Sequence, residues 1–279
     1  MKARYLDFHQ TSGLPFPLPP TESSVLRYLA HLQLNGFAPK TLRVQLAGLS
    51  FFSKVNGWWD PSSSFRIRRA IEGWMRLAPR RNDTRRPVSL AMMRQFWMIL
   101  DDTCSTPFEA KLFRAAFTLA FYGAFRSSEL LPASRDDWHG NALSGHDVQI
   151  DGTRLTINLR RSKTDQAGQG TMVTLVPAPA GDPCPVQSLR EYLSVRPHLT
   201  GPLLLHADGH CLSRYQFTAV LRACIRQAHL PPEQFGIHSF RIGAATHAFE
   251  EGLPTSDIMA VGRWRSAAFK AYIRPGPAF

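Results

Sequence analysis

Apolar residues recur every three or four positions in the first third of the chain, which indicates a small all-helical domain. This pattern predicts helices over about residues 21–36, 39–56 and 63–78, with polar side chains on the opposite faces. The prolines among the first twenty residues predict an extended lead-in over residues 1–19. Three short helices suit one small core, so residues 20–78 are expected to form an all-α domain.

A basic segment bracketed by prolines follows this domain. Residues 79–87, PRRNDTRRP, have no apolar periodicity and predict an exposed linker. Residues 88–279 again show mostly helical spacing, at about 90–100, 109–125, 185–195, 213–229, 239–251 and 256–262. Short β-like runs with turn glycines between them occur at 146–150, 154–159 and 171–176. The expected fold class is therefore mainly α with a small antiparallel β-sheet, in two domains.

Charge and hydropathy narrow the class of protein. The 279 residues are 44% hydrophobic, enough for a substantial core, and this excludes wholesale disorder. Lys and Arg number 33 against 21 Asp and Glu, and this surplus of +12 favours a polyanionic partner such as nucleic acid. No apolar run approaches the roughly 20 residues of a membrane span, and residues 1–10 lack a signal-peptide core. We expect no membrane partner, no secretion, and a location in the nucleus of a eukaryote or otherwise in the cytoplasm.

Two helices of the small domain carry cations on the face away from their apolar stripe. Arg43, Ala47, Ser50 and Lys54 share one such face, and Arg66, Arg69, Gly73 and Arg76 share the other. A solvated surface is the commoner explanation of such patterns. Two faces together with a basic linker favour double-stranded DNA, because long cations reach phosphates and small residues allow close approach. The predicted DNA-binding residues are Lys40, Arg43, Lys54, Arg66, Arg69, Arg76, Arg80, Arg81, Arg85 and Arg86.

A cluster of potential metal ligands, His206, His210 and Cys211, is better explained as a turn. Asp208 and Gly209 lie between them and are typical of a β-hairpin. The sequence also has no clustered carboxylate set for Mg²⁺ and no phosphate-binding P-loop. We therefore predict no metal and no cofactor.

Five segments of the larger domain carry residues that fit one reaction. They are FYGAFRSSELL with Arg126 and Glu129, RRSKTDQAGQG with Lys163, HSFR with His238 and Arg241, GRWRS with Arg263 and Trp264, and FKAYIR with Tyr272. Each segment alone has an ordinary structural explanation as an ion pair, a solvated turn or a packed ring. Their joint order is far more specific than any one of them.

Cleavage of a phosphodiester needs these residue types. Two arginines can bind both non-bridging oxygens and neutralise the charge of a pentacoordinate transition state. A tyrosine hydroxyl can attack phosphorus and form a covalent intermediate that preserves the bond energy for religation. A lysine on a hairpin can protonate the departing sugar oxygen, and a histidine can handle the proton of the nucleophile. The residues favour a route without metal or ATP.

In these segments and their order, the sequence resembles the tyrosine recombinase (phage integrase) family, over nearly its whole length. The resemblance implies an α-helical core-binding domain over residues 20–78 and a catalytic domain over 88–279. It also implies site-specific strand exchange through a 3′-phosphotyrosyl intermediate, on double-stranded DNA, by a dimer or tetramer. Carried over by position, Arg126, Glu129, Lys163, His238, Arg241 and Tyr272 match the family's catalytic residues, with Lys163 as general acid and Tyr272 as nucleophile.

Two positions depart from the family pattern. The family usually has His or Trp nine residues before the tyrosine, whereas here Arg263 is nine and Trp264 eight residues before it. Either Trp264, which we favour slightly, fills the role after a one-residue shift, or Arg263 contacts the phosphate. Only seven residues, two of them proline, follow Tyr272, too few for the C-terminal helix that family members often exchange. This favours assembly through another surface or a shortened sequence.

The sequence leaves open the subgroup of recombinases that the chain resembles most, and it leaves open two rival functions. The segments HSFRIGAATHAFEEG and GRWRSAAFKAYIR resemble recombinases of DIRS/Ngaro-type or Crypton mobile elements more than bacterial ones. The first rival is a type IB-like DNA topoisomerase, which relaxes DNA by the same chemistry without site preference. The second is a catalytically silent DNA-binding protein derived from a mobile element, which binds a site without forming a covalent adduct.

Overall fold

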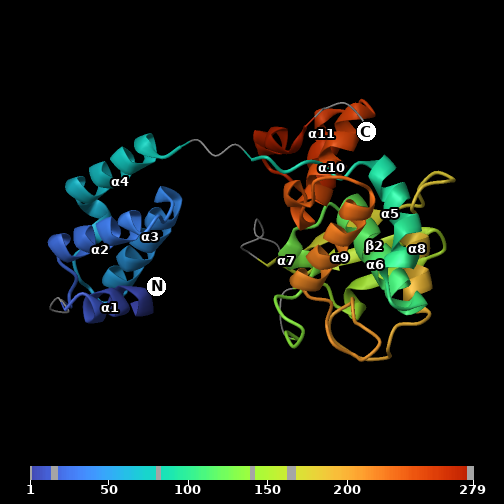
Figure 1. The fold of residues 1–279 in the computed structure, drawn as a ribbon, viewed down its shortest axis with the longest axis horizontal. Helices are drawn as coiled ribbons and strands as arrows, with labels where there is room; N and C mark the ends of the chain where they lie inside the picture. Colours follow the sequence, from blue (N-terminus) through green and yellow to red (C-terminus); the bar gives the residue numbers. More distant parts are fainter. Residues whose placement is uncertain (1, 14–17, 80–82, 139–141, 162–167, 275–279) are drawn as a thin grey trace. The chain divides into compact units, whose positions relative to one another are not determined.

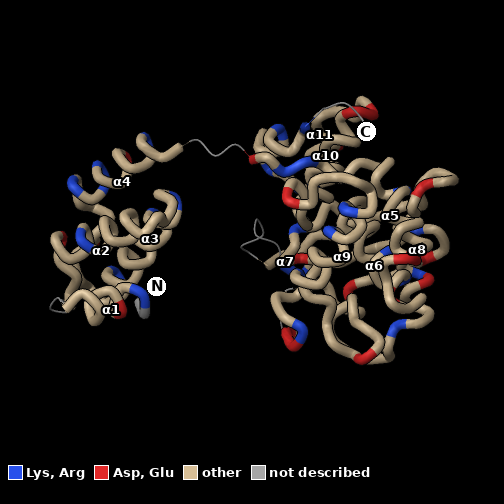
Figure 2. Tube along the Cα trace, in the orientation of Figure 1, with Lys and Arg blue, Asp and Glu red and all other residues tan. Residues whose placement is uncertain are grey.

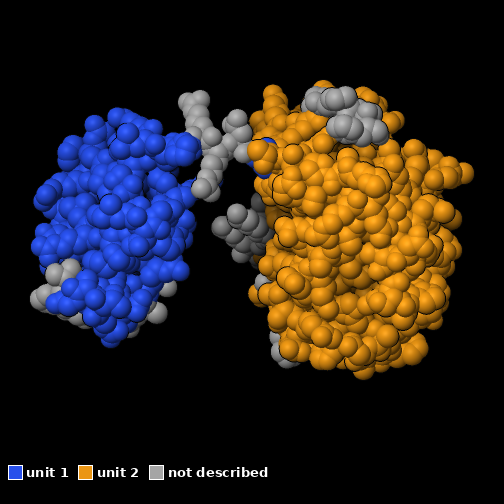
Figure 3. All heavy atoms as spheres, in the orientation of Figure 1, with its two compact units in different colours: residues 1–83 blue, residues 84–279 orange. Residues whose placement is uncertain are grey.

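The chain forms two compact units, residues Met1–Asp83 and Thr84–Phe279, each with its own hydrophobic core (Figures 1 and 3). The computed structural model describes residues 2–13, 18–79, 83–138, 142–161 and 168–274. The division between the units falls within the segment expected to be a linker. Among the described residues, no helix is both long and apolar enough to cross a membrane.

Unit 1 is all-helical. Its helices are α1 (Lys2–Thr11), α2 (Glu22–Leu34), α3 (Pro39–Val55) and α4 (Phe65–Leu77), with a short 3-10 turn at Pro61–Ser63 before α4. Helices α2, α3 and α4 contact one another, and their inward apolar residues form the core of the unit. Leu29, Leu42 and Ile67 are fully buried there, one from each helix. The three predicted helices thus lie within a few residues of the observed ones.

The expected extended lead-in over residues 1–19 is wrong for its first half, because Lys2–Thr11 is helical. Tyr5 and Phe8 are buried, and their rings lie 5.2 and 5.6 Å from the ring of Tyr28 on α2. The Tyr5 hydroxyl is also 2.7 Å from the Ser24 hydroxyl. The prolines that motivated the expectation begin at residue 15, after α1 has ended, so they do not interrupt it.

Unit 2 is mainly helical around one long buried helix. Its elements are α5 (Leu90–Thr103), α6 (Pro107–Tyr122), α7 (Ser127–Leu130), β1 (Val148–Asp151), β2 (Arg154–Leu159), β3 (Thr171–Leu175), α8 (Pro185–Leu193), α9 (Arg214–Gln227), α10 (Ile237–Glu250) and α11 (Thr255–Gly262), with 3-10 turns at Gly145–Asp147, Pro232–Gln234 and Ala267–Tyr272. Helix α6 packs against α5, α8 and α10 (Figure 1). It was expected to continue to residue 125 but ends at Tyr122, because Gly123 caps it and Ala124 has a left-handed φ of 42°.

The sheet has the strand order β1-β2-β3, and both pairings are antiparallel. Leu155, Ile157 and Leu159 alternate along β2 and are buried in the core of unit 2, whereas the residues between them are more exposed. The central strand therefore faces the core on one side, as the period-two pattern of its sequence predicts.

The last part of the expected linker belongs to unit 2 and is not an exposed connection. The Arg86 amide donates to the Gln234 carbonyl at 2.9 Å, and the Val88 amide donates to the Ser239 carbonyl at 3.0 Å. These backbone bonds attach the segment to α10 and to the turn before it. The expected boundaries, a linker to residue 87 and a domain from 88, therefore lie about four residues too late.

The close approach of this segment to α10 depends on Gly243. A Cβ at that position would meet the Val88 carbonyl oxygen at 1.9 Å and the Val88 carbonyl carbon at 2.9 Å. Both atoms are backbone, so neither can move aside as the end of a flexible side chain can. A residue without a side chain is required where a helix and a second backbone approach so closely.

We predict that Gly243→Ala destabilises unit 2 by about 3 kcal/mol, because the added methyl forces α10 and residues 86–88 apart. The matched control is Gly236→Ala, at the N-cap of the same helix, where a Cβ has open space. It should cost about 1 kcal/mol or less. Urea unfolding followed by circular dichroism measures both changes. Equal stability of the two variants would contradict the close-packing argument.

Candidate active site

The predicted catalytic residues come together where α6, α7, α10 and the end of the chain meet. Arg126 is the N-cap of α7, and Glu129 lies in its single turn. His238 and Arg241, three residues apart, lie in the first turns of α10. Arg263 and Trp264 directly follow α11, and Tyr272 ends the 3-10 turn Ala267–Tyr272. Lys163 lies outside the described residues.

The carboxylate of Glu129 holds two of the arginines. One oxygen accepts from Arg126 Nη1 at 2.7 Å, and the other accepts from the Arg126 backbone amide at 2.8 Å and from Arg263 Nη2 at 3.0 Å. The Glu129 side chain is only 3% exposed, so water competes little for these bonds. The carboxylate thus fixes both guanidinium groups relative to each other.

The turn at the end of α6 binds arginines through backbone carbonyls. The Gly123 carbonyl accepts from Arg263 Nη1 at 2.8 Å, and the Ala124 carbonyl accepts from Arg263 Nη2 at 3.3 Å. Arg241 Nη1 donates to the same Ala124 carbonyl. Two arginines that are 22 positions apart in the sequence therefore share one acceptor, and sequence reasoning identified neither carbonyl.

Arg241 is buried and covered by aromatic rings. Its Nη2 donates to the Gly262 carbonyl at 2.6 Å, and its guanidinium lies 4.5 Å from the ring centroid of Trp264 and 5.5 Å from that of Tyr272. Burial, together with the neighbouring cations of Arg126 and Arg263, lowers the pKa of Arg241 to about 10. Burial also lowers the pKa of Arg263, against the opposing effect of Glu129.

The cluster of Arg126, Arg241 and Arg263 includes N–H donors that form no hydrogen bond within the described part of the chain. Among the described residues, the buried Nε atoms of Arg241 and Arg263 have no hydrogen-bond partner. Three guanidinium groups face one carboxylate, so the cluster carries excess positive charge. An unsatisfied donor in such surroundings is what a bound anion would satisfy.

Tyr272 lies against this cluster. Its ring is 5.1 Å from the ring of His238 and 4.9 Å from that of Trp264. The Thr246 hydroxyl on α10 donates to the Tyr272 carbonyl at 3.2 Å and accepts from the Arg274 amide at 3.1 Å, so it holds the backbone on both sides of residue 273. Thr246 was not predicted, although it follows Arg241 by about one and a half turns of the same helix.

Arg263 and Trp264 are adjacent in sequence but contact different groups. Arg263 has a left-handed φ of 56°, and its side chain bonds to α7 and to the turn after α6. Trp264 instead contacts Arg241 and Tyr272. The two side chains can point in different directions because residue 262 is a glycine. A Cβ at that position would lie 1.9 Å from the Trp264 ring and would exclude the ring from its place.

The predicted DNA-binding cations on α3 and α4 are exposed, but several are already paired. Figure 2 shows where Lys and Arg occur along these helices. Lys54 lies 3.0 Å from Asp60, Arg66 3.2 Å from Glu22, and Arg69 2.7 Å from Glu72. Lys40, Arg43 and Arg76 are exposed as well. Ser50, expected on the cationic face of α3, is instead buried, because its position turns toward Ser62, whose hydroxyl is 3.2 Å away.

Two of the four linker arginines, Arg85 and Arg86, lie in the part of the chain that the structure describes. Arg85 is exposed, whereas Arg86 is half-buried with its guanidinium 5.9 Å from the ring centroid of Phe235. Arg80 and Arg81 lie outside the described residues.

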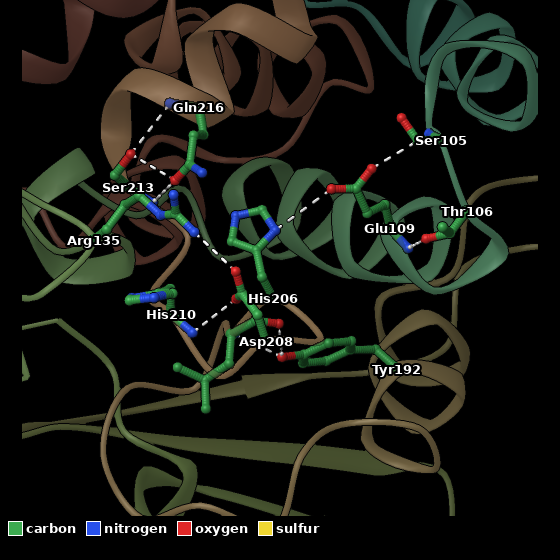
Figure 4. Close-up of polar contacts among 11 residues, drawn as sticks. Ser105, Thr106, Glu109, Arg135, Tyr192, His206, Asp208, His210, Ser213 and Gln216 are labelled. Carbon is green, nitrogen blue, oxygen red and sulfur yellow. Dashed lines mark hydrogen bonds and ion pairs between the residues drawn. The ribbon is translucent and has the colours of Figure 1, made fainter.

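The segment around His206 and Cys211 is a hairpin turn closed by a bridge between Leu205 and Cys211. Figure 4 shows His206 directed toward Glu109, with Nδ1 3.6 Å from the carboxylate, and Asp208 paired with Arg135 at 2.9 Å. His210 instead lies 3.3 Å from Asp136. Across the part of the chain that the structure describes, no three His, Cys, Asp or Glu side chains are grouped so as to hold a metal ion.

Comparison with known proteins relates this arrangement to integrases and recombinases. The chain is 23% identical over 285 residues to the integrase/recombinase XerD homolog of Selenomonas ruminantium, across 99% of this chain and 79% of the relative. No family model matches the sequence.

Solved structures with similar folds include the Tn1549 transposon integrase with circular-intermediate DNA (TM-score 0.57, 12% identity, 92% of this chain and 82% of that one). XerH recombinase bound to a palindromic difH substrate has a TM-score of 0.60 at 15% identity, over 92% and 67% of the two chains. A lambda integrase dimer on a COC′ core site has a TM-score of 0.60 at 15% identity, over 97% and 70%. These likenesses confirm the predicted fold class.

Proposed function

We propose that this chain is a site-specific DNA recombinase or integrase that cleaves and rejoins strands through a 3′-phosphotyrosyl link to Tyr272. The observation that carries the proposal is the position of Tyr272, a hydroxyl nucleophile beside a buried cluster of three arginines and a histidine. The similarity to the XerD homolog, and the fold shared with recombinases solved on DNA, support it.

In the proposed step, the Tyr272 oxygen attacks the phosphorus of a DNA phosphodiester, and the bond from phosphorus to the 5′ oxygen of the departing strand breaks. His238 takes the proton of the attacking hydroxyl, and Lys163 supplies one to the departing oxygen. Attack by a 5′ hydroxyl on the phosphotyrosyl bond reverses the step and restores Tyr272. No oxidant, reductant or nucleotide is consumed.

The arginine cluster is suited to the transition state of this reaction. A pentacoordinate phosphorane carries one more negative charge than the diester, and preorganised cations in a buried site stabilise it strongly. The lowered pKa of Arg241 reflects first the cost of burying its cation and then the cost of holding it beside Arg126 and Arg263. The negative charge of a bound phosphate would offset the cost of burying these cations. The cluster is therefore suited to bind an anion in preference to water.

The contacts of Arg263 and Trp264 support distinct roles for them. The Arg263 guanidinium donates to Glu129 and to two backbone carbonyls, so we assign it a positioning role: it fixes Glu129, which in turn holds Arg126. Trp264 lies beside Tyr272 and Arg241, one residue from the position where the family usually has His or Trp. This interpretation favours the one-residue shift over phosphate contact by Arg263.

We also propose that copies of the chain assemble on duplex DNA, as in the lambda integrase dimer. The affiliation with DIRS/Ngaro-type or Crypton elements, and a nuclear location in a eukaryotic source, stay predictions from the wording of the HSFR and GRWRS segments.

We predict that Tyr272→Phe abolishes covalent attachment to DNA and leaves binding nearly unchanged, because only the hydroxyl is removed. The substrate is a duplex selected from a randomised pool by the full chain and nicked near the cleavage position. Denaturing gels detect the adduct, and a filter-binding assay detects the complex. A denaturant-resistant adduct with the Phe variant would show that another residue is the nucleophile.

Arg126→Ala and Arg241→Ala should each slow single-turnover cleavage on the order of 10²-fold or more, as expected for the loss of one preorganised charge donor. Arg126 is the more exposed of the two, so its variant tests the assignment even where the buried Arg241→Ala fails to fold. Arg135→Ala, from an exposed ion pair, serves as the control. Unchanged rates in the folded variants would refute the phosphate-binding assignment.

Arg263→Ala should also slow cleavage, but by displacing Arg126 and not by removing a phosphate contact. A methylphosphonate at the cleaved linkage has one charged oxygen fewer and needs less neutralisation. It should therefore recover part of the rate lost by Arg241→Ala and none of that lost by Arg263→Ala. Equal recovery in both variants, measured by single-turnover cleavage, would mean that Arg263 contacts the phosphate directly.

A further inference from the structure

Helix α3 exposes three large apolar side chains in one line. Val44, Phe51 and Val55 are 67%, 71% and 69% exposed, and their spacing of seven and four residues places them on the same side of the helix. The opposite side, with Leu42, Leu46 and Leu49, is buried in the core of unit 1. We call Val44, Phe51 and Val55 the apolar stripe of α3.

Cations border this stripe along one edge. Arg43 and Lys54 are each adjacent in sequence to a member of the stripe, and the small exposed Ala47 lies between them on the same edge. Lys40 precedes them by one turn. Among the described residues, Lys40 and Arg43 form no ion pair.

Helix α4 differs in this respect. Its Arg66 and Arg69 are occupied by Glu22 and Glu72. A phosphate would have to displace those carboxylates, whereas Lys40 and Arg43 can bind one without such competition. Among the described residues, Arg68 and Arg76 of α4 are exposed and form no ion pair either, so α3 is distinguished by the apolar stripe beside its cations and not by its charges alone.

A second copy of the chain fits the stripe poorly. Three side chains of this size expose a few hundred Å² together, less than the roughly 800 Å² that each partner of a stable complex buries. A two-fold interface would also bring Arg43 and Lys54 of both copies together, and like charges oppose such pairing. The occupant should instead be negatively charged at the edge of the stripe and apolar along it.

We propose that α3 lies in the major groove of duplex DNA, where its apolar stripe contacts thymine methyl groups and so favours A·T base pairs; this rests on the proposed function. Apolar side chains cannot hydrogen-bond to base edges, and the C5 methyl of thymine, present only in the major groove, is the apolar group that the groove offers. Phosphates at its rim would meet Lys40 and Arg43.

The dimensions agree with this placement. The stripe runs over about 16 Å of helix, at about 1.5 Å per residue. That length corresponds to about five base-pair steps of about 3.4 Å each. The major groove is about 12 Å wide and admits an α-helix.

The experiment uses the full chain and the duplex selected from a randomised pool. Replacing thymine by uracil in that duplex removes only the methyl groups. We expect binding to weaken about four-fold for each contacted methyl, the effect of exposing one buried methyl group. Phe51→Ala should bind more weakly and lose most of this thymine-to-uracil difference, without changing the dependence on salt.

Two matched variants separate the contributions. Met98→Ala removes an apolar side chain that is also 71% exposed, but on α5, and should keep the full thymine-to-uracil difference. Arg43→Gln should keep that difference too, yet reduce the log–log salt slope by about 0.9, one phosphate contact.

The outcomes distinguish this inference from the proposed function. Binding that is salt-dependent but indifferent to uracil would refute the role of the stripe and leave strand exchange standing. Absence of any salt-dependent duplex binding would refute both. Sedimentation without DNA provides a further check: a concentration-dependent dimer that Phe51→Ala dissociates would show that a second copy covers the stripe, and would overturn the proposal.

Discussion

The carboxylate of Glu129 is the group on which the rest of the site depends. It is buried between Arg126 and Arg263, close to the further cation of Arg241. Burying guanidinium groups side by side is costly unless a counter-charge and hydrogen bonds compensate for the lost solvent. One carboxylate with three short bonds does so for two of the arginines. It leaves the cluster short of negative charge, which is the condition under which a phosphate binds well.

The turn after α6 supplies the remaining compensation. Helix α6 is almost completely buried in the core of unit 2, so its C-terminal end cannot shift without disturbing that core. The Gly123 and Ala124 carbonyls at this end accept from Arg241 and Arg263. The positions of two cations are thereby coupled to the packing of the whole unit, and the precision of the site follows from the rigidity of one helix.

Much of this arrangement could be predicted from the sequence, and what could not has physical causes. Periodicity located the three strands and the helices from α2 onward except α7, whose single turn is too short to show a period. The order of the motifs located the residues that the structure brings around Tyr272. Helix α1 was missed because prolines beyond its end were given too much weight. The carbonyl acceptors carry no side-chain signal, and the divergence of Arg263 from Trp264 depends on a left-handed residue that no periodic pattern marks.

The attachment of residues 86–88 to unit 2 has a mechanical consequence. The chain that leaves unit 1 is hydrogen-bonded at Val88 to the carbonyl of Ser239, the residue directly after His238. Gly243, one turn further along α10, allows the two backbones to lie in contact. A tension on the connecting chain is therefore transmitted through Arg86 to the turn that ends at Gln234, and through Val88 to the helix that carries His238 and Arg241.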